Sequence, residues 1–397
     1  MDKFDAVVIG GGPAGATAAT DLAKEGHSVL LLDRAGRIKP CGGAIPPILL
    51  QEFEISEHLL KARIQSARIV SPKDRLADMP IDGGFVGMVD RETFDEWLRE
   101  RAAEFGATRR TGTFDNLTRE DDGTVLVTFK KHLDDGFEVT ETVRTCLVIG
   151  ADGASSAVAR QALPSEEAPP FVFAYHEIIR SPKLTNNDTF DGHRCDVYYK
   201  GSLSPDFYAW IFPHGETTSV GTGSAHKGFS LRSAVADLRE ITGLNTTATI
   251  RKEGAPIPLR PRKRWDNGRD VIVAGDAAGV VAPASGEGIY YAMLSGRMVA
   301  EAVSEVLKTG ESKHLSKARK RFMKAHGRVF WVLGIMQRFW YRNDSRRERF
   351  VTMCRDPDVQ TLTWQAYMHK KLVRTKPMAH VRIFIKDMAH LLGVVAP

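Results

Sequence analysis

The sequence predicts an α/β protein in which a discontinuous dinucleotide-binding domain is joined to an inserted antiparallel β-sheet domain and a helical C-terminal region. Three observations lead to this prediction. The chain opens on a βαβ pattern with a glycine-rich turn, two later strands end in glycine-containing turns, and alternating apolar runs lie between those two. With 397 residues, 43% hydrophobic and 26% charged, the chain is long enough to bury a cofactor.

The opening pattern is typical of a Rossmann-like βαβ unit. The run at 6–9 is short, apolar and rich in valine and isoleucine, as in a buried parallel strand. Small and apolar residues at helical spacing follow over 14–22, and a second apolar strand is expected at 29–32. The unit therefore has the element order of a dinucleotide-binding motif.

The glycines of the first turn have distinct expected roles. Gly10 permits the tight turn, Gly12 lets the backbone approach a pyrophosphate, and Gly15 allows close helix packing. The start of the helix attracts phosphates, and Asp33 is placed to accept ribose hydroxyls. A purely structural turn is the alternative, but the strand, the helix and the acidic residue all favour dinucleotide binding. The residues expected at the dinucleotide here are Gly10, Gly12, Pro13, Ala14, Gly15, Asp33 and Arg34.

Two later segments indicate which dinucleotide is bound. Each of 146–156 and 271–289 reads as an apolar strand followed by a glycine-containing turn and a helix start. Both resemble the internal motifs of the para-hydroxybenzoate hydroxylase-like flavoprotein superfamily, and the resemblance implies FAD, with an aspartate against the ribityl chain. Two ordinary strand-to-turn junctions are the alternative. The residues that the resemblance assigns to FAD are Asp152, Gly275, Asp276, Gly286, Gly288 and Ile289.

The segment 89–98 reads as a helix start with apolar residues at Phe94, Trp97 and Leu98. It resembles the arginine-bearing helix of the same superfamily. The resemblance implies that Arg91 neutralises the FAD pyrophosphate. An arginine solvated at a helix start is the alternative.

These placements predict the domain organisation. Alternating apolar runs at 171–173, 196–199 and 208–212, separated by turn residues, are typical of an antiparallel sheet that forms a substrate domain. The tail has a helical pattern rich in arginine, lysine and aromatic residues. The expected boundaries are 1–65, 86–165 and 266–315 for the FAD-binding domain, 66–85 and 166–265 for the β-sheet domain, and 316–397 for the helical region.

An aromatic strand is the most discriminating element of the insert. Tyr208, Trp210 and Phe212 share one face because side chains alternate along a strand, and Pro213 and a Gly-Thr-Gly at 221–223 follow. This pattern resembles the YxWxFP…GxG motif of geranylgeranyl reductases. The resemblance implies that Tyr208, Trp210, Phe212 and Pro213 line a pocket for a polyprenyl chain. Packing of this face against the protein core is the alternative.

The loop 39–46 adds a second link to that family. It reads KPCGGAIP and resembles the segment that lies beside the flavin in chlorophyll-type geranylgeranyl reductases. The similarity covers nearly the whole chain and is closer to the chlorophyll branch than to the archaeal membrane-lipid reductases. Residues 331–341 depart from the pattern, and no role is assigned to them by it. The resemblance places Cys41, Gly42, Gly43 and Ala44 at the flavin.

The family resemblance implies an FAD-dependent reductase that saturates isoprenoid double bonds of geranylgeranyl-(bacterio)chlorophyll, of geranylgeranyl diphosphate, or of both. NADPH is the implied electron donor, and its contact is expected to be transient because a second GxGxxG fingerprint is missing from the sequence. Reduced ferredoxin is the alternative donor. The alternative functions are a related polyprenyl-lipid reductase, an FAD-dependent aromatic monooxygenase with a polar phenol site, and an electron-relay module.

Reduction of an isolated double bond needs a hydride and a proton, because such an alkene is not electrophilic. The flavin is expected to face the aromatic strand near Trp210, whose ring can stabilise cationic character. Cys41 is the first candidate for moving the proton or gating the flavin, with a structural cysteine as the alternative. His214 is the second candidate, although a histidine after a proline is usually structural.

Composition and charge exclude several classes of function. The four cysteines show neither paired nor metal-ligand spacing, so neither a disulfide framework nor a metal site is expected. No run approaches the roughly 20 apolar residues of a spanning helix, and the N-terminus lacks a signal or transit pattern. The protein is therefore expected in the cytoplasm, without a nucleic-acid partner. The formal charge of +6 and the basic aromatic segment 313–349 also fit peripheral membrane contact, with helix packing as the alternative.

Overall fold

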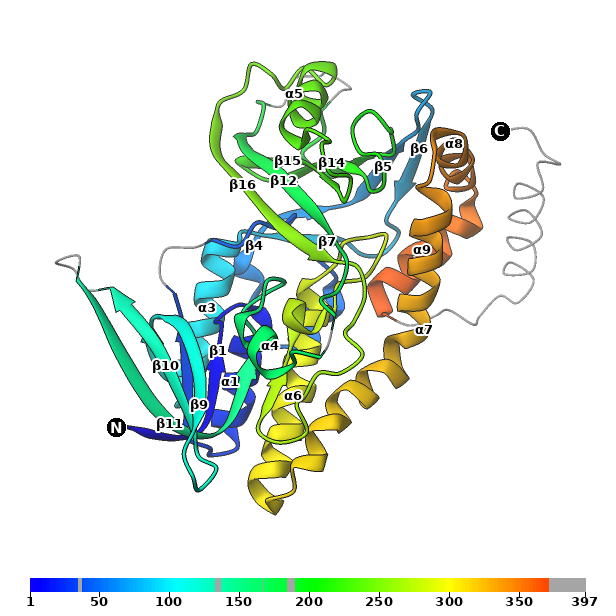
Figure 1. Ribbon diagram of the computed structural model, residues 1–397. Coiled ribbons are helices and arrows are strands. Elements are labelled where there is room, and N and C mark those ends of the chain that lie inside the picture. The colour runs from blue at the N-terminus through cyan, green and yellow to red at the C-terminus, as the bar shows by residue number, and fades with distance from the viewer. Residues whose placement is uncertain (35–37, 133–136, 166, 184–189, 371–397) are drawn as a thin grey trace. The chain divides into compact units, whose positions relative to one another are not determined.

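The computed structural model divides the chain into two compact units (Figure 1). The first unit comprises Met1–Lys39, Arg91–Phe171 and Pro256–Phe330, and the second comprises Pro40–Asp90, Val172–Ala255 and Trp331–Pro397. The structure describes residues 1–34, 38–132, 137–165, 167–183 and 190–370.

A mostly parallel sheet forms the centre of the first unit. The strands run in the order β8 (Thr108–Thr111), β2 (Val29–Asp33), β1 (Lys3–Ile9), β11 (Glu138–Gly150), β10 (Val125–His132) and β9 (Thr113–Arg119), with β17 (Val271–Val273) also paired to β11. Pairs β1–β2, β1–β11, β11–β17 and β2–β8 are parallel, and β10 is antiparallel to both neighbours. The expected βαβ unit and the two later strands are confirmed, because their buried apolar runs fill the middle of this sheet.

The helices of the first unit pack closely through small residues. They are α1 (Pro13–Lys24), α3 (Arg91–Glu104), α4 (Ala157–Ala162) and α6 (Ile289–Thr309), with short 3₁₀ turns η2 (Gly275–Ala278) and η3 (Ser312–Leu315). Helix α1 contacts both α3 and α6. A Cβ at Gly296 of α6 would lie 2.2 Å from the carbonyl oxygen of Ala14, so the two backbones touch here. This close approach holds the start of α1 in place.

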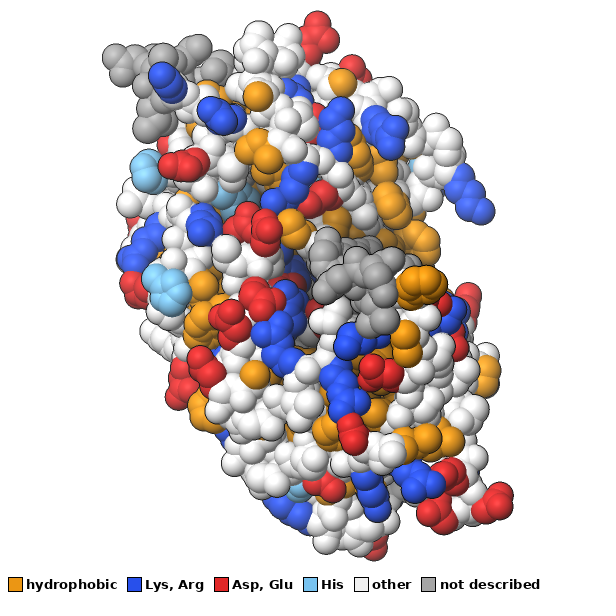
Figure 2. All heavy atoms as spheres, turned by 90° about the vertical axis from the view of Figure 1, so that its left-hand side faces the viewer, with side chains coloured by type: hydrophobic (Ala, Val, Ile, Leu, Met, Phe, Trp, Pro, Cys, Tyr) orange, Lys and Arg blue, Asp and Glu red, His pale blue; other side chains and the backbone are white. Residues whose placement is uncertain are grey.

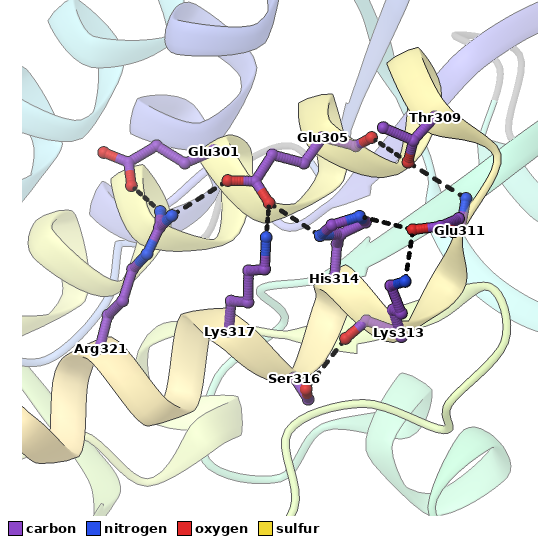
Figure 3. Close-up of polar contacts among 9 residues, drawn as sticks. All are labelled: Glu301, Glu305, Thr309, Glu311, Lys313, His314, Ser316, Lys317 and Arg321. Carbon is purple, nitrogen blue, oxygen red and sulfur yellow. Dashed lines mark hydrogen bonds and ion pairs between the residues drawn. The ribbon is translucent and has the colours of Figure 1, made fainter.

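An ion-pair cluster fastens α6 to the beginning of α7 (Ser316–Trp340), as Figure 3 shows. Glu305 is its centre, because its carboxylate lies 2.6 Å from Lys317 Nζ, 3.0 Å from His314 Nδ1 and 3.0 Å from Arg321 Nη2. Glu301 lies 2.6 Å from Arg321 Nη1. The pairs hold the pKa of Glu305 below its usual value, chiefly through the hydrogen bond from Lys317. The network therefore ties the first turns of α7 to α6.

Two sheets build the second unit. The larger has the order β16 (Thr249–Pro258), β12 (Phe171–Arg180), β15 (Thr217–Ser224), β14 (Ala209–His214), β13 (Arg194–Tyr198), β5 (Ser66–Val70) and β6 (Leu76–Pro80). The smaller consists of β3 (Ala44–Ile45), β7 (Val86–Val89) and β4 (Leu60–Ile64). In the larger sheet the pairs β12–β15, β15–β14, β14–β13 and β5–β6 are antiparallel as expected, whereas β13–β5 is parallel.

Helix α5 (Leu231–Ile241) covers one face of the larger sheet. An apolar core forms between them, to which β14 contributes Ala209 and Ile211. The remaining helices of this unit are α2 (Pro47–Glu52), the 3₁₀ turn η1 (Glu57–Leu59), α8 (Asp344–Met353) and α9 (Pro357–His369). The helical tail is thus confirmed as far as the structure describes it, and residues 371–397 lie outside the described part.

The two units divide the chain at other positions than the expected domain boundaries. Residues 40–65 and 86–90 belong to the second unit, because β3 and β4 pair with β7 there. The tail is not a separate unit, since α7 begins in the first unit and ends in the second.

The expectations about cysteines, metal sites and membrane-spanning helices can be compared with the structure over the described residues. The four cysteines are free thiols. Among these residues no cluster of acidic, histidine or cysteine side chains has the arrangement of a metal site. In the same part of the chain, no helix combines the length and apolar character that crossing a membrane requires.

Candidate active site

The three glycine motifs of the first unit meet at one edge of the sheet. The register pairs Ile9 with Leu32 on one side and with Gly150 on the other, and Gly150 with Val273. Each of these residues is the last or nearly the last of its strand. The turns that follow therefore begin side by side, at the carboxyl edge where ligands bind in open α/β sheets.

In the first turn, two positions require glycine because a side chain would clash there, and a third glycine faces open space. Gly10 has a φ of 106°, and a Cβ there would lie 2.3 Å from Ala151 O. A Cβ at Gly15 would lie 1.9 Å from Gly10 O. A Cβ at Gly12 would meet nothing within 4 Å, and Gly12 begins α1 without a side-chain cap. The open backbone at Gly12 thus fits a pyrophosphate at the helix start.

Asp33 lies beside this turn together with an arginine that sequence reasoning missed. Arg99 Nη1 donates to Asp33 Oδ2 at 3.1 Å and to the carbonyl of Gly11 at 3.3 Å. The amide of Arg34 donates to Asp33 Oδ1 at 2.9 Å. Burial raises the pKa of Asp33, and Arg99 opposes that shift. The sequence position of Arg99 does not indicate this contact, because Arg99 reaches Asp33 only once α3 packs beside the first turn.

Arg91 is buried and paired within its own helix. Its Nε and Nη2 donate to the carboxylate of Asp95 at 2.7 and 2.6 Å, one helical turn later. The alternative of a solvated arginine is excluded, since Arg91 is 5% exposed. Its pairing with a pyrophosphate stays a prediction.

Asp152 uses its carboxylate as a helix cap. Oδ2 accepts from the amides of Ala157 and Val158 at 2.6 and 3.2 Å, and Oδ1 accepts from Ser156 Oγ. Burial raises the pKa of Asp152. The structure therefore shows this side chain fixing the turn before α4, and a direct contact with FAD stays a prediction.

The third motif places an acid and a second open helix start together. Gly275 has a φ of 61°, and a Cβ there would lie 2.7 Å from the Cβ of Ala14, so η2 touches the start of α1. Lys39 donates to Asp276 Oδ2. Gly288 begins α6 without a side-chain cap, and a Cβ there would lie 3.8 Å from Asp276 Oδ1. Asp276 and the start of α6 thus border the same space.

The loop before α6 is held in a strained shape. Ala284 and Gly286 have φ values of 64° and 67°, which is unusual for alanine. The amide of Gly286 donates to Ala282 O at 3.0 Å, and the amide of Ala282 donates to Glu287 O at 2.9 Å. These bonds present the backbone ahead of Ile289, the first residue of α6. Strain of this kind is typical of binding loops.

Taken residue by residue, the first unit fits FAD. Two helix starts lack side-chain caps, the carboxylates of Asp33 and Asp276 lie beside them, and Gly12 leaves open space at the backbone. The structure thus brings together in one place five residues that the sequence predicted for the site: Gly10, Gly12, Gly15, Asp33 and Asp276.

The loop that begins at Cys41 lies in the second unit and packs on β14. A Cβ at Gly42 would lie 3.0 Å from Phe212 Cδ2, and one at Gly43, whose φ is 70°, would lie 2.6 Å from His214 Nε2. The amide of Gly43 donates to Cys41 Sγ at 3.4 Å. The structure therefore joins two motifs that sequence reasoning linked only through the family resemblance, with Ala44 entering β3 directly afterwards.

The two faces of β14 have different neighbours. Ala209 and Ile211 belong to the core under α5, whereas Tyr208, Trp210 and Phe212 alternate with them and point to the other face. Ring centroids lie 6.0 Å apart for Tyr208–Trp210 and 6.1 Å apart for Trp210–Phe212. The aromatic face therefore lies outside the α5 core, with Tyr208 and Trp210 themselves buried at 8% and 5% exposed, and we call it the aromatic wall. Pro213 alternates with Phe212 and so lies on the α5 side.

The outer end of the wall adjoins helix α9. Phe212 packs with Ala44, Trp364, Tyr367 and Met368 against a small apolar cluster of β4, β7 and β13. The indole nitrogen of Trp364 is buried and has no hydrogen-bond partner among the described residues. Helix α9 thus contributes to the surroundings of the wall, which no sequence motif indicated.

A polar chain lies behind Trp210. Trp210 Nε1 donates to Ser219 Oγ at 3.0 Å, Ser219 Oγ lies 2.8 Å from His176 Nδ1, and His176 Nε2 lies 3.0 Å from Glu253 Oε2. Burial acts to raise the pKa of Glu253, but the hydrogen bond from His176 keeps it below its usual value. The ionised carboxylate then accepts from His176 Nε2–H. Sequence reasoning missed this chain, because its members come from four strands.

His214 is neutral at physiological pH. Burial lowers its pKa to about 4. Nδ1 lies 2.9 Å from the carbonyl oxygen of Phe212, so the neutral ring donates there. Since the imidazolium form is disfavoured, His214 is poorly suited to supply a proton.

Family models match most of the chain. One described as an FAD binding domain matches residues 57–326, and one described as an NAD(P)-binding Rossmann-like domain matches residues 8–51.

Individual relatives match its full length. The chain is 55% identical over 395 residues to a geranylgeranyl diphosphate reductase of Rhodobacter capsulatus, covering 100% of this chain and 99% of the relative. It is 33% identical to a chloroplastic geranylgeranyl diphosphate reductase of Oryza sativa, covering 99% and 87%. A solved structure of a geranylgeranyl bacteriochlorophyll reductase-like protein from Thermoplasma acidophilum has a TM-score of 0.79 at 22% identity, covering 96% and 100%.

Proposed function

We propose that this chain, which belongs to the geranylgeranyl diphosphate reductase family, uses FAD to saturate isolated double bonds of a geranylgeranyl chain. The observation that carries the proposal is the aromatic wall, which stands apart from the α5 core. An apolar aromatic surface suits isoprene units, whereas an aromatic monooxygenase needs polar groups for a phenol.

The chemistry requires one hydride and one proton for each double bond, delivered to the two alkene carbons. FAD, when bound and reduced, would supply the hydride and return to its oxidised form, and NADPH is the proposed source of the electrons that reduce it again. The wall aligns the chain by burying it away from water, and the face of Trp210 stabilises positive charge that develops on the alkene. The hydrogen bond from the indole nitrogen of Trp210 to Ser219 holds the ring in that orientation.

Cys41 is the proposed proton carrier. The Gly43 amide orients its sulfur, and the neighbouring His214 is neutral and therefore the weaker acid. Cys41→Ser is expected to lower turnover while flavin content stays normal. Full turnover in this variant would exclude the role, and Cys354→Ser, which alters a buried thiol elsewhere, is the matched control.

Both free geranylgeranyl diphosphate and the pigment-esterified chain are proposed substrates, with phytyl products for chlorophyll or bacteriochlorophyll. Because both are lipophilic, the proposal includes peripheral contact with the membrane that carries them.

The test uses purified, FAD-loaded protein with NADPH and each substrate in detergent. Mass spectrometry should show products heavier by two hydrogens for each bond reduced, with matching NADPH consumption. Trp210→Phe should lower turnover, whereas Trp265→Phe, which alters a fully buried tryptophan in the first unit, should not. The proposal fails if polyprenyl substrates stay unreduced with NADPH and with chemically reduced flavin, or if phenols instead drive oxygen consumption.

A further inference from the structure

Helix α7 exposes an apolar island that the chemistry above does not use. Trp331, Val332 and Ile335 are 69%, 36% and 47% exposed. Tryptophan is seldom this exposed, and residues four apart stand one above the other on a helix. The three side chains therefore form one patch, which we call the α7 island.

Basic residues flank the island along the helix. Lys324 and Arg328 lie in the two turns before it, Arg338 lies in the turn after it, and Arg342 lies two residues beyond the helix end. All four are exposed. Steps of four and three residues keep Lys324, Arg328 and Arg338 on the side of the island, with Arg328 and Arg338 about 15 Å apart along the axis. Cations thus stand at both ends of an apolar centre.

The charge of this segment is not balanced locally. Between Glu311 and Asp344 the sequence has nine lysines and arginines and no acid. Lys313, Lys317 and Arg321 pair with glutamates at the helix start (Figure 3). On the face drawn in Figure 2, by contrast, basic and acidic side chains are mixed.

The four cations around the island form no ion pair with any residue that the structure describes. The island and its cations therefore form a positively charged apolar stripe.

The fold does not need the island. The other side of α7 buries Phe322 and Phe330, which pack on Tyr291 with ring centroids 6.1 and 4.9 Å away. Of the other aromatic residues of the basic segment, Trp340 and Tyr341 are buried as well. Phe339 is half-buried, so the membrane contact expected of this segment can involve only part of it, and Trp331 is its exposed aromatic residue.

We propose that the α7 stripe lies on the surface of an anionic lipid bilayer. This deepens the membrane contact of the proposed function and rests on it. The island enters the boundary between headgroups and acyl chains, while the flanking lysine and arginines pair with lipid phosphates. A second copy of this chain is disfavoured as the occupant, because it would bring the same positive charges face to face.

The experiment measures co-sedimentation of the full-length, FAD-loaded protein with vesicles of phosphatidylcholine, with and without phosphatidylglycerol. Wild-type protein should bind the anionic vesicles, and added salt should weaken binding. Trp331→Ser with Ile335→Ser should weaken it on the order of tenfold. Arg338→Glu with Arg342→Glu should weaken it by more than about 25-fold, since each cation contributes about fivefold.

Matched controls separate the stripe from general surface effects. Phe137→Ser removes an aromatic side chain that is 70% exposed elsewhere, and Lys227→Glu with Lys263→Glu changes the net charge equally. Both should bind like wild type.

Turnover with substrate in detergent should be unchanged in every stripe variant, so loss of vesicle binding is distinguishable from failure of the reductase proposal. Wild-type binding by the stripe variants, equal binding to neutral vesicles, or a dimer that the variants dissociate would overturn the proposal.

Discussion

The indole nitrogen of Trp210 donates to Ser219 Oγ at 3.0 Å, and the same oxygen lies 2.8 Å from His176 Nδ1. One buried hydroxyl on β15 thus satisfies two rings on β12 and β14, the strands on either side of it. Because Ser219 is fully buried, water cannot take its place without rearrangement. The orientation of the central ring of the aromatic wall therefore depends on a residue that does not belong to the wall.

Ser219→Ala should lower the free energy of unfolding by about 1–3 kcal/mol, because two buried polar atoms lose their partner. It should also raise KM for the polyprenyl substrate. Urea unfolding and steady-state kinetics measure the two effects. Ser181→Ala removes a half-buried hydroxyl that bonds Thr218 and should cost less. Equal costs for the two variants would contradict the assigned role.

Gly12→Ala and Gly15→Ala should fail in different ways. The alanine methyl at 12 meets no protein atom, so the apoprotein should keep its melting temperature while its affinity for FAD falls. The methyl at 15 would lie 1.9 Å from Gly10 O, so the apoprotein itself should be destabilised. Thermal unfolding of apoprotein and flavin titration separate the effects. Normal FAD affinity in Gly12→Ala would show that the pyrophosphate does not bind at this turn.

His214→Asn should flatten the acid side of the stability profile. The folded pKa of His214, about 4, lies below the unfolded value of about 6.5, so the unfolded state binds the proton first as pH falls. Wild-type protein should therefore lose stability between about pH 6.5 and pH 4, by at most about 3 kcal/mol from this group. Asparagine can still donate to the Phe212 carbonyl. Urea unfolding across this pH range measures the stability of both proteins. Parallel stability profiles for wild type and His214→Asn would show that His214 does not cause the loss of stability at acid pH.

Lys39→Gln should lower the midpoint potential of the bound flavin. Lys39 donates to Asp276, and losing its charge leaves the carboxylate uncompensated beside the proposed flavin site, which disfavours the added electrons. A cost of about 1.4 kcal/mol corresponds to about 30 mV for a two-electron couple. Lys308→Gln, which breaks a pair with Glu25, is the control. Spectroscopic titration against a reference dye measures both, and a raised or unchanged potential in Lys39→Gln would place Asp276 away from the flavin.

Local patterns were sufficient for the strands and glycine turns of the first unit. The runs at 6–9, 29–32 and 271–273 are short, apolar and bounded by glycine or aspartate, and each became a buried parallel strand. Period-two alternation likewise separated the aromatic face of β14 from its core face. These predictions depend on backbone geometry and side-chain spacing, which neighbouring residues determine.

Partners between distant segments were beyond such patterns. Arg91 and Arg99 lie on the same helix, but only the placement of α3 beside the first turn brings Arg99 to Asp33. Asp152 stands in a recognisable motif, yet its carboxylate caps α4. The spacing of residues along one element says which face they share and does not say what lies opposite that face.

By itself, the sequence determined the βαβ unit, the three strand ends with their glycines and the aromatic alternation of β14, because these follow from interactions within short segments. Only the tertiary structure decided that His176, Ser219 and Glu253 stand behind Trp210, and that Phe330 is buried while Trp331 is exposed. Those outcomes depend on which elements pack together, and packing brings together residues that are far apart along the chain.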